Sequence, residues 1–143
     1  MDRQQIIMNY SVPPSLEDLE VLAQEIFETL PEEITEFCDG VAIRIEQLPD
    51  EAIEEELSLE DPFELLALFR SGKEISPGVT SKTANDDDVL ILYRRPILDV
   101  WCDTQDQLSI VIREAMILEL GRNFDFSDDE IDDLTQRHFQ GLL

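Results

Sequence analysis

Residues 105–134, QDQLSIVIREAMILELGRNFDFSDDEIDDL, decide the fold that this sequence predicts. Apolar side chains in the first half recur with the 3.6-residue period of a helix face. Ser127 and Glu130 then have the spacing of a capping box, which marks the start of a second helix with an acidic first turn. The stretch therefore predicts a long apolar helix, loosened at Gly121, followed by a turn and a final helix. The apolar positions are Leu108, Val111, Ile112, Ala115 and Leu118.

The upstream part of the chain predicts helices alternating with short strands. A helix should begin at the cap Ser15 and end before Pro31. Residues 41–45 alternate as a strand, residues 89–93 form an apolar run typical of a buried strand, and residues 63–70 favour a strand although their composition also suits a helix. The remaining segments are short helices at 32–38 and 97–102, an acidic solvated helix or loop at 50–61, and a loop at 71–87.

These segments predict one domain of the α+β class. A chain of 143 residues can bury roughly two-thirds of its unfolded surface, so it needs no disulfide or metal to fold. We expect a flexible N-terminal arm at residues 1–14 and a single domain at residues 15–143. Within that domain, a small mixed or antiparallel sheet should have helices packed on one face.

The charge of the chain is strongly unbalanced. Ten Lys and Arg stand against 34 Asp and Glu, which gives a formal net charge of −24. Phosphates would be repelled rather than neutralised, so we expect neither nucleic acid nor an anionic membrane as a partner. A strongly solvated surface is the simplest interpretation. A basic protein partner, an imitation of nucleic-acid charge and adaptation to high salt remain open.

The cysteines and the apolar runs bear on the compartment. Cys38 and Cys102 are far apart and lack CxxC spacing, so we expect free thiols in a reducing compartment. The N-terminal sequence lacks the pattern of a signal peptide. No apolar run approaches the ~18 residues of a membrane span. The sequence thus predicts a cytoplasmic protein.

Most of the chain resembles a small family of minimal zincin-like metallopeptidases. The resemblance rests on VLILYRRPIL at 89–98, the long helix after it, and GRNFDFSDDEIDDL at 121–134, and it covers roughly residues 16–139. The family carries the motif H-E-x-x-H-x-x-G-x-x-D. The resemblance implies a zincin-like minimal metallopeptidase fold, with the motif helix behind the sheet. It also implies that an extended peptide adds to the sheet edge, for which we expect the strand at 63–70.

The family motif has a physical logic. Two histidines one helical turn apart share a zinc ion, the glutamate acts as general base, and the aspartate is the third ligand. On this sequence the resemblance places Glu119 at the general-base position and Asp128 at the third-ligand position. Leu118 and Arg122 stand where the histidines belong, and Asp125 replaces the glycine. Glu119 is thus the vestigial catalytic position.

These replacements argue against zinc in the family manner. Leucine has no donor atom, and arginine is a permanent cation, so we expect no cofactor although the family implies zinc. A second register, Arg113-Glu114-x-x-Ile117, also lacks histidine and is not followed by a suitable turn and aspartate. His138, the single histidine, should lie on the surface of the last helix and supplies one ligand at most.

Two alternative arrangements of the charged residues follow. Arg122 could supply the positive charge that zinc once supplied and hold Glu119 and Asp128 in an ion-pair cluster. Three separate surface charges are the simpler interpretation. A hard cation such as calcium or magnesium could instead be held by oxygen atoms of four carboxylates. These are Glu119, Asp125, Asp128 and Asp129.

Three functions are compatible with the sequence. The first is a catalytically inactive metallopeptidase relative that binds a peptide or protein. The second is an acidic interaction module whose charge is the function, with basic partners held in a salt-sensitive way. The third is a hydrolase that works without the family zinc. The oligomeric state is left open by the sequence.

Overall fold

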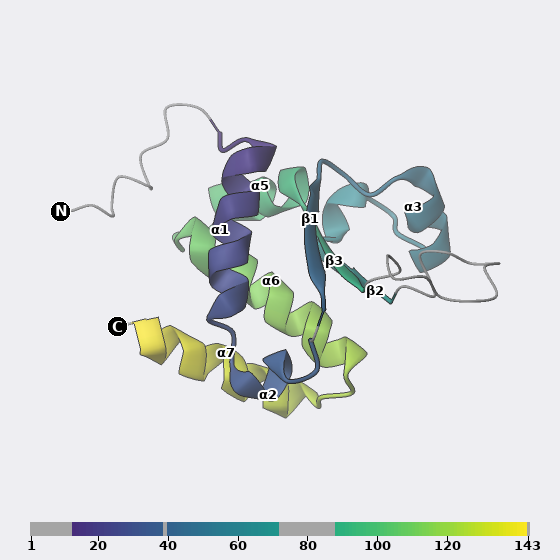
Figure 1. The fold of residues 1–143 in the computed structure, drawn as a ribbon. Coiled ribbons are helices and arrows are strands. Elements are labelled where there is room, and N and C mark those ends of the chain that lie inside the picture. Colours follow the sequence, from purple (N-terminus) through teal and green to yellow (C-terminus); the bar gives the residue numbers. More distant parts are fainter. Residues whose placement is uncertain (1–12, 39, 72–87, 143) are drawn as a thin grey trace.

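The computed structural model describes residues 13–38, 40–71 and 88–142, with side chains described up to Gln136 (Figure 1). Most of the predicted arm and of the predicted loop at 71–87 lie outside these residues. The helices are α1 (Leu16–Glu28), α2 (Glu32–Thr35), α3 (Glu51–Leu57), α5 (Arg94–Asp103), α6 (Leu108–Asn123) and α7 (Asp128–Leu142), with a 3₁₀ turn η2 (Pro62–Glu64). The strands are β1 (Ala42–Glu46), β2 (Ala67–Arg70) and β3 (Val89–Tyr93).

The three strands form a mixed sheet, which confirms the predicted α+β class. The strand order is β1-β3-β2, with β1 parallel to β3 and β2 antiparallel to it. All five residues of β3 are buried, as the apolar run at 89–93 predicts. β2 lies at a sheet edge, as expected, although the run from Phe63 becomes a strand only at Ala67 because Pro62 begins a 3₁₀ turn.

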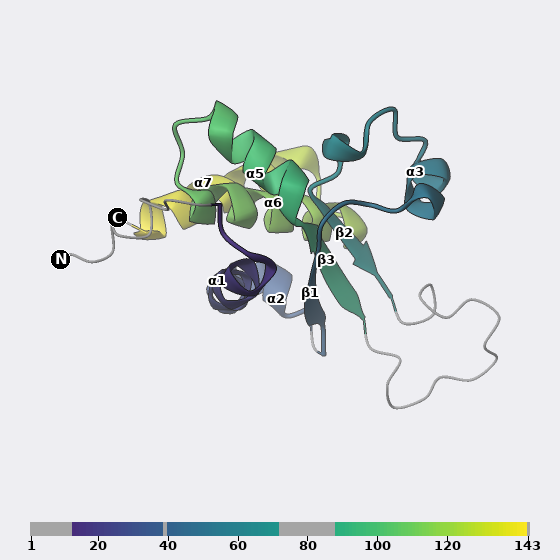
Figure 2. The same ribbon diagram turned by 90° about the horizontal axis from the view of Figure 1, so that it is seen from above.

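Helices cover both faces of the sheet, whereas we expected one. The main core joins α1, α6 and α7 to the face that carries Ala67, Phe69, Leu90 and Leu92. On the other face a smaller cluster packs beneath Ile53 of α3 and Leu65, and Figure 2 shows α3 on the side of the sheet opposite α1. The acidic segment at 50–61 therefore has a packing role besides solvation. The buried members of the smaller cluster are Leu68, Val89, Ile91 and Tyr93.

Two capping boxes fix the starts of α1 and α7. The backbone N–H of Asp18 donates to Ser15 Oγ at 3.1 Å, and its carboxylate accepts from the Ser15 N–H at 3.0 Å. The backbone N–H of Glu130 donates to Ser127 Oγ at 3.1 Å, and its carboxylate accepts from the Ser127 N–H at 2.7 Å. Both boxes confirm the caps predicted from the sequence.

The basic pair that follows β3 joins distant parts of the chain. Arg94 Nε donates to the carbonyl oxygen of Pro14 at 2.7 Å, and Arg94 Nη1 donates to Gln47 Oε1 at 3.1 Å. The guanidinium of Arg95 lies over the ring of Phe63, 5.5 Å from its centroid. Arg94 thereby fastens the segment before α1 to the segment after β1. No helix within the described ranges is long and apolar enough to cross a membrane.

Candidate functional site

A groove of about 160 Å³ lies between the β2 edge of the sheet and α6. Its walls are mostly apolar, but one carboxylate and one guanidinium of α6 line it. This is the place where the resemblance puts the motif helix and the docking edge. The lining residues are Glu64, Leu65, Leu66, Ala67, Ala115, Leu118, Glu119 and Arg122.

The backbone of β2 presents alternating groups to this groove. The Tyr93 N–H donates to the carbonyl oxygen of Leu66 at 2.9 Å, so Leu66 points its backbone groups toward β3. In an antiparallel ladder the orientation alternates, and the register pairs Leu68 with Ile91 in the same way. The backbone groups of Ala67 and Phe69 therefore point outward, away from β3.

Glu119 forms a hydrogen bond with one of these outward backbone groups. Its Oε2 accepts a hydrogen bond of 2.8 Å from the backbone N–H of Phe69 and one of 2.9 Å from Asn123 Nδ2. Asn123 Nδ2 also donates to the Glu119 carbonyl oxygen at 3.0 Å, which steadies the arrangement. Glu119 is thus a bridge from α6 to the edge strand.

Burial controls the acidity of this carboxyl group. Desolvation raises the pKa of Glu119 above its usual value. The hydrogen bonds from Phe69 and Asn123, and the charges of Arg122 and Arg70, lower it again in part. The net shift of the pKa is upward, so desolvation of the carboxylate outweighs its stabilisation by these hydrogen bonds and charges.

The groove contains both positions at which the resemblance places the motif's histidines. Leu118 and Arg122 line it one helical turn apart, and the side chain of Leu118 is 41 % exposed. Arg122 is also exposed, and within the described part of the chain no ion pair joins it to Glu119 or Asp128. The structure brings Glu119 and Arg122 to one groove without the ion-pair cluster that was one of the two arrangements left open by the sequence. Asp128 lies at the exposed start of α7.

The turn after α6 contains a residue in the left-handed backbone conformation, which glycine adopts most easily. Asp125 has a φ of 66°, in the left-handed region that favours glycine. The Phe126 N–H donates to the Gly121 carbonyl at 2.9 Å and the Asp125 N–H to the Arg122 carbonyl at 3.3 Å, which is the Schellman pattern of a helix end. Asp125 therefore occupies the motif's glycine position in conformation as well as in spacing.

The alternative placement of the motif on Arg113-Glu114-x-x-Ile117 does not face the groove. Arg113 is 5 % exposed and Ile117 is fully buried, so both lie in the core. Burial raises the pKa of the half-buried Glu114, and the charge of Asp106 adds to that shift. Neither Arg113, Glu114 nor Ile117 lines the groove, whereas Glu119 does.

The residues present do not fit the zinc ion that the family motif implies. Leu118 offers only carbon atoms, Arg122 is a cation, and the Glu119 carboxylate is engaged by two hydrogen-bond donors. Among the described residues no group of three His, Cys, Asp or Glu side chains could hold a metal ion, and this includes the four carboxylates considered for calcium or magnesium. The side chain of His138 lies outside the described residues.

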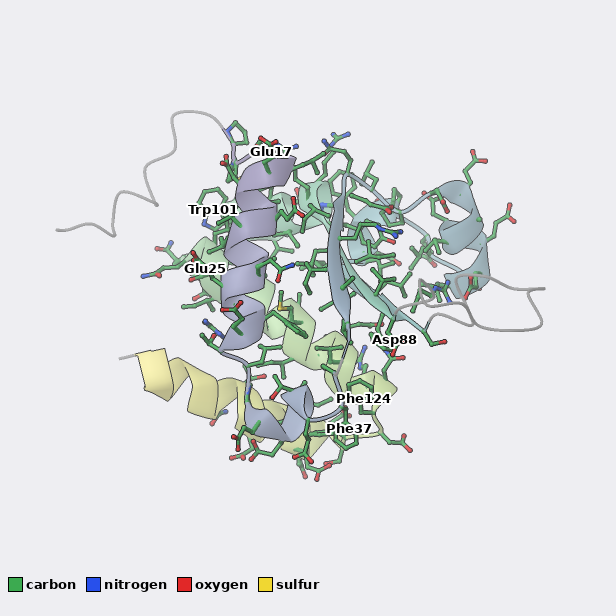
Figure 3. The ribbon with its side chains drawn as sticks, viewed as in Figure 1. Glu17, Glu25, Phe37, Asp88, Trp101 and Phe124 are labelled. Atoms are coloured by element: carbon green, nitrogen blue, oxygen red, sulfur yellow. The ribbon has the colours of Figure 1, made fainter. Side chains whose placement is uncertain are left out.

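Two features of the site are not among those that the sequence predicts. Asn123 belongs to no motif position, although an amide four residues after a glutamate on a helix can reach its carboxylate. An aromatic cluster lies at the end of α6. Phe37 stacks on Phe124, with 5.1 Å between ring centroids (Figure 3). Phe124 is edge-on to Phe69, with 5.6 Å between ring centroids. Phe37 remains 52 % exposed. This cluster unites three segments that are distant in sequence, so no local pattern predicts it.

The chain belongs to the zincin-like metallopeptidase family. The family's model matches residues 38–138, which is more than half of the chain and includes the whole sheet and α6. The resemblance stated from the motif is thereby confirmed. A search of curated proteins found no match for the chain.

Proposed function

We propose that this protein is a catalytically inactive member of its family that binds an extended peptide segment along the edge of its sheet. The observation that carries the proposal is the groove between β2 and α6, in which an edge strand with outward backbone groups faces a helix surface that carries both apolar and charged side chains. A strand added there gains main-chain hydrogen bonds from Ala67 and Phe69. Ala115 and Leu118 offer an apolar contact for one of its side chains.

The chemistry of the motif positions supports the loss of catalysis. A metallopeptidase needs a metal-bound water beside its general base. In this chain neither Leu118 nor Arg122 can ligate zinc, and Glu119 is held by Phe69 and Asn123. The walls of the groove are nevertheless mostly apolar, and an apolar wall can hold a peptide side chain without any catalytic step.

Two measurements test this proposal together. Random octapeptides displayed on phage are selected on the protein, and the selected peptide is titrated by calorimetry. Leu118→Asp should weaken binding at least about tenfold, because it places a charge against the apolar side chain of the peptide. Val21→Asp is the matched control, since Val21 is a 62 % exposed apolar residue on α1, outside the groove lining. Equal losses in both variants would contradict docking in the groove.

The absence of peptidase activity is tested separately. We expect no cleavage of labelled casein by the protein with zinc added or with EDTA. Elemental analysis of the purified protein should find no stoichiometric zinc. Cleavage that survives EDTA and is lost in Glu119→Gln would favour a hydrolase that works without zinc.

A second candidate function is an acidic interaction module. The observation that favours it is the run of exposed acidic side chains on the first turns of α7, in a chain with a net charge of −24. Such a surface attracts basic partners, and the attraction is screened by salt. Capture that disappears at high salt and is unaffected by Leu118→Asp would select this function. The run comprises Asp128, Asp129, Glu130, Asp132 and Asp133.

A further inference from the structure

We propose that Glu119 is a built-in competitor for the docking edge, and that a bound peptide replaces it at the backbone N–H of Phe69. This inference rests on the proposed function, because it describes how the same groove is controlled. The ligand class is an extended peptide segment with a backbone carbonyl at Phe69 and an apolar side chain over Leu118. The motif glutamate then sets the affinity of the groove rather than catalysing a reaction.

The position of the Glu119 carboxylate carries the argument. The outward N–H of Phe69 is where the carbonyl of an added strand would accept its hydrogen bond, since the neighbouring outward residue is Ala67, two positions away. Glu119 Oε2 already accepts from that N–H at 2.8 Å. A carbonyl and a carboxylate oxygen cannot both take this place, so an incoming strand must displace Glu119 to pair along the whole of β2.

The same contact explains how the edge of the sheet is kept from unwanted pairing. An edge strand with free backbone groups is a template for association with other chains, and covering the edge with a neighbouring element is one way of preventing this. Glu119 projects from α6 onto the edge of β2 and fits this description. Asn123 holds the carboxylate in place through a 2.9 Å hydrogen bond from Nδ2.

The displaced carboxylate has a partner within reach. Arg122 lies three residues from Glu119 on the same helix and lines the same groove. Within the described residues its guanidinium forms no ion pair in this structure. On peptide binding Glu119 can move from Phe69 to Arg122, and the ion pair that the sequence predicts would belong to the occupied state.

The experiment compares variants that remove or loosen the competitor. Octapeptides are selected from the phage library on the wild type and on Glu119→Ala in parallel, and the strongest peptide is titrated against both. We expect Glu119→Ala to bind it roughly tenfold more tightly, because no charge-assisted hydrogen bond has to be broken first. Asn123→Ala, at an exposed position, should give a gain in the same direction of roughly twofold to fivefold. Glu17→Ala on α1 changes the net charge equally and should change nothing.

Amide hydrogen exchange at Phe69 supplies a direct readout. In the free wild type this amide should be protected, in free Glu119→Ala it should exchange faster, and peptide should restore the protection. Equal peptide affinity of the wild type, Glu119→Ala and Asn123→Ala, with unchanged protection at Phe69, would overturn the competitor role while leaving peptide binding intact. Failure of every protein to bind any peptide would overturn both the competitor role and the proposed function.

Discussion

Gly121 of α6 lies against Ile131 of α7 so closely that a Cβ atom at Gly121 would come within 2.7 Å of Ile131 Cγ1. The replacement of glycine by alanine usually stabilises a helix interior by about 1 kcal/mol. Here the two helices have no room for the extra carbon, and we expect Gly121→Ala to lower the free energy of unfolding by about 1–3 kcal/mol. Urea denaturation measures the change.

The double variant Gly121→Ala/Ile131→Ala is the control for this contact. Alanine at position 131 lacks both Cγ1 and Cδ1, the two atoms that the new Cβ would meet, so Gly121→Ala should cost at least about 0.5 kcal/mol less in the Ile131→Ala background than in the wild type. A Gly121→Ala variant that is more stable than the wild type would show that helix propensity outweighs packing at this position.

Arg113→Met should stabilise the protein. Arg113 is 5 % exposed, desolvation lowers its pKa, and its Nε and Nη1 have no hydrogen-bond partner among the described residues. Replacement of a buried charge by an apolar side chain of similar size often raises the free energy of unfolding, here by about 1–3 kcal/mol. Arg44→Met is the matched control, because the Arg44 side chain is 53 % exposed, and it should stay within about 0.5 kcal/mol of the wild type. A marked loss in Arg113→Met would reveal a partner for the guanidinium.

Glu119→Gln should alter how stability depends on pH. Burial raises the pKa of Glu119 in the folded state, so the native protein binds this proton more tightly than the unfolded chain does. The corresponding stability is fully present below the pKa of the unfolded chain and is lost as the pH rises through the higher, folded pKa. Glutamine does not titrate, and its side-chain oxygen can still accept from the Phe69 N–H.

The unfolding free energy of Glu119→Gln, measured against that of the wild type between pH 4 and pH 8, should therefore shift in favour of the variant as the pH rises. Glu17→Gln, at the exposed start of α1 (Figure 3), changes the net charge in the same way and is the control. A difference that stays constant with pH would contradict the raised pKa of Glu119.

Histidines at positions 118 and 122, where the family motif has its two histidines, should create a zinc site. Leu118 and Arg122 project into one groove from successive turns of α6, which is the spacing that two zinc ligands need. We expect the double variant Leu118→His/Arg122→His to bind one zinc ion per chain with a micromolar dissociation constant, which neither single variant should match. Calorimetry with zinc and the absorption spectrum of the cobalt form measure this. If adding Asp128→Asn abolishes the zinc binding of the double variant, Asp128 is the third ligand. A double variant that gives no heat with zinc would contradict the placement of the motif histidines at positions 118 and 122.

Local signals predicted much of the fold. The caps Ser15 and Ser127 and the apolar strand at 89–93 depend on neighbours within a few residues, and each lies where the sequence places it. The role of Gly121 was not predictable, because its neighbour Ile131 belongs to another helix and becomes relevant only once α6 and α7 are packed. The helix in fact continues past Gly121 to Asn123.

In the candidate site, too, the sequence predicts local features and not the contacts between distant segments. The sequence indicates which residues stand at the motif positions, since the motif is local to α6 and the turn after it. The hydrogen bond between Glu119 and Phe69 spans 50 residues and depends on where β2 lies, so the sequence instead suggested Arg122 as the nearer partner. The coverage of the second sheet face by α3 was hidden for a similar reason, because a single half-buried Ile53 in an acidic segment gives a weak signal.

The hydrogen bonds of Arg94 limit where this chain can be truncated without loss of its fold. The family's model begins at residue 38, but Arg94 lies inside the matched region and holds Pro14, which lies outside it. α1 also packs Leu19, Ala23 and Ile26 into the core that α6 and the sheet share. The stretch by which the chain is assigned to its family is therefore shorter than the unit that folds, and a fragment trimmed to the family boundary would leave the apolar surface of α6 open to water.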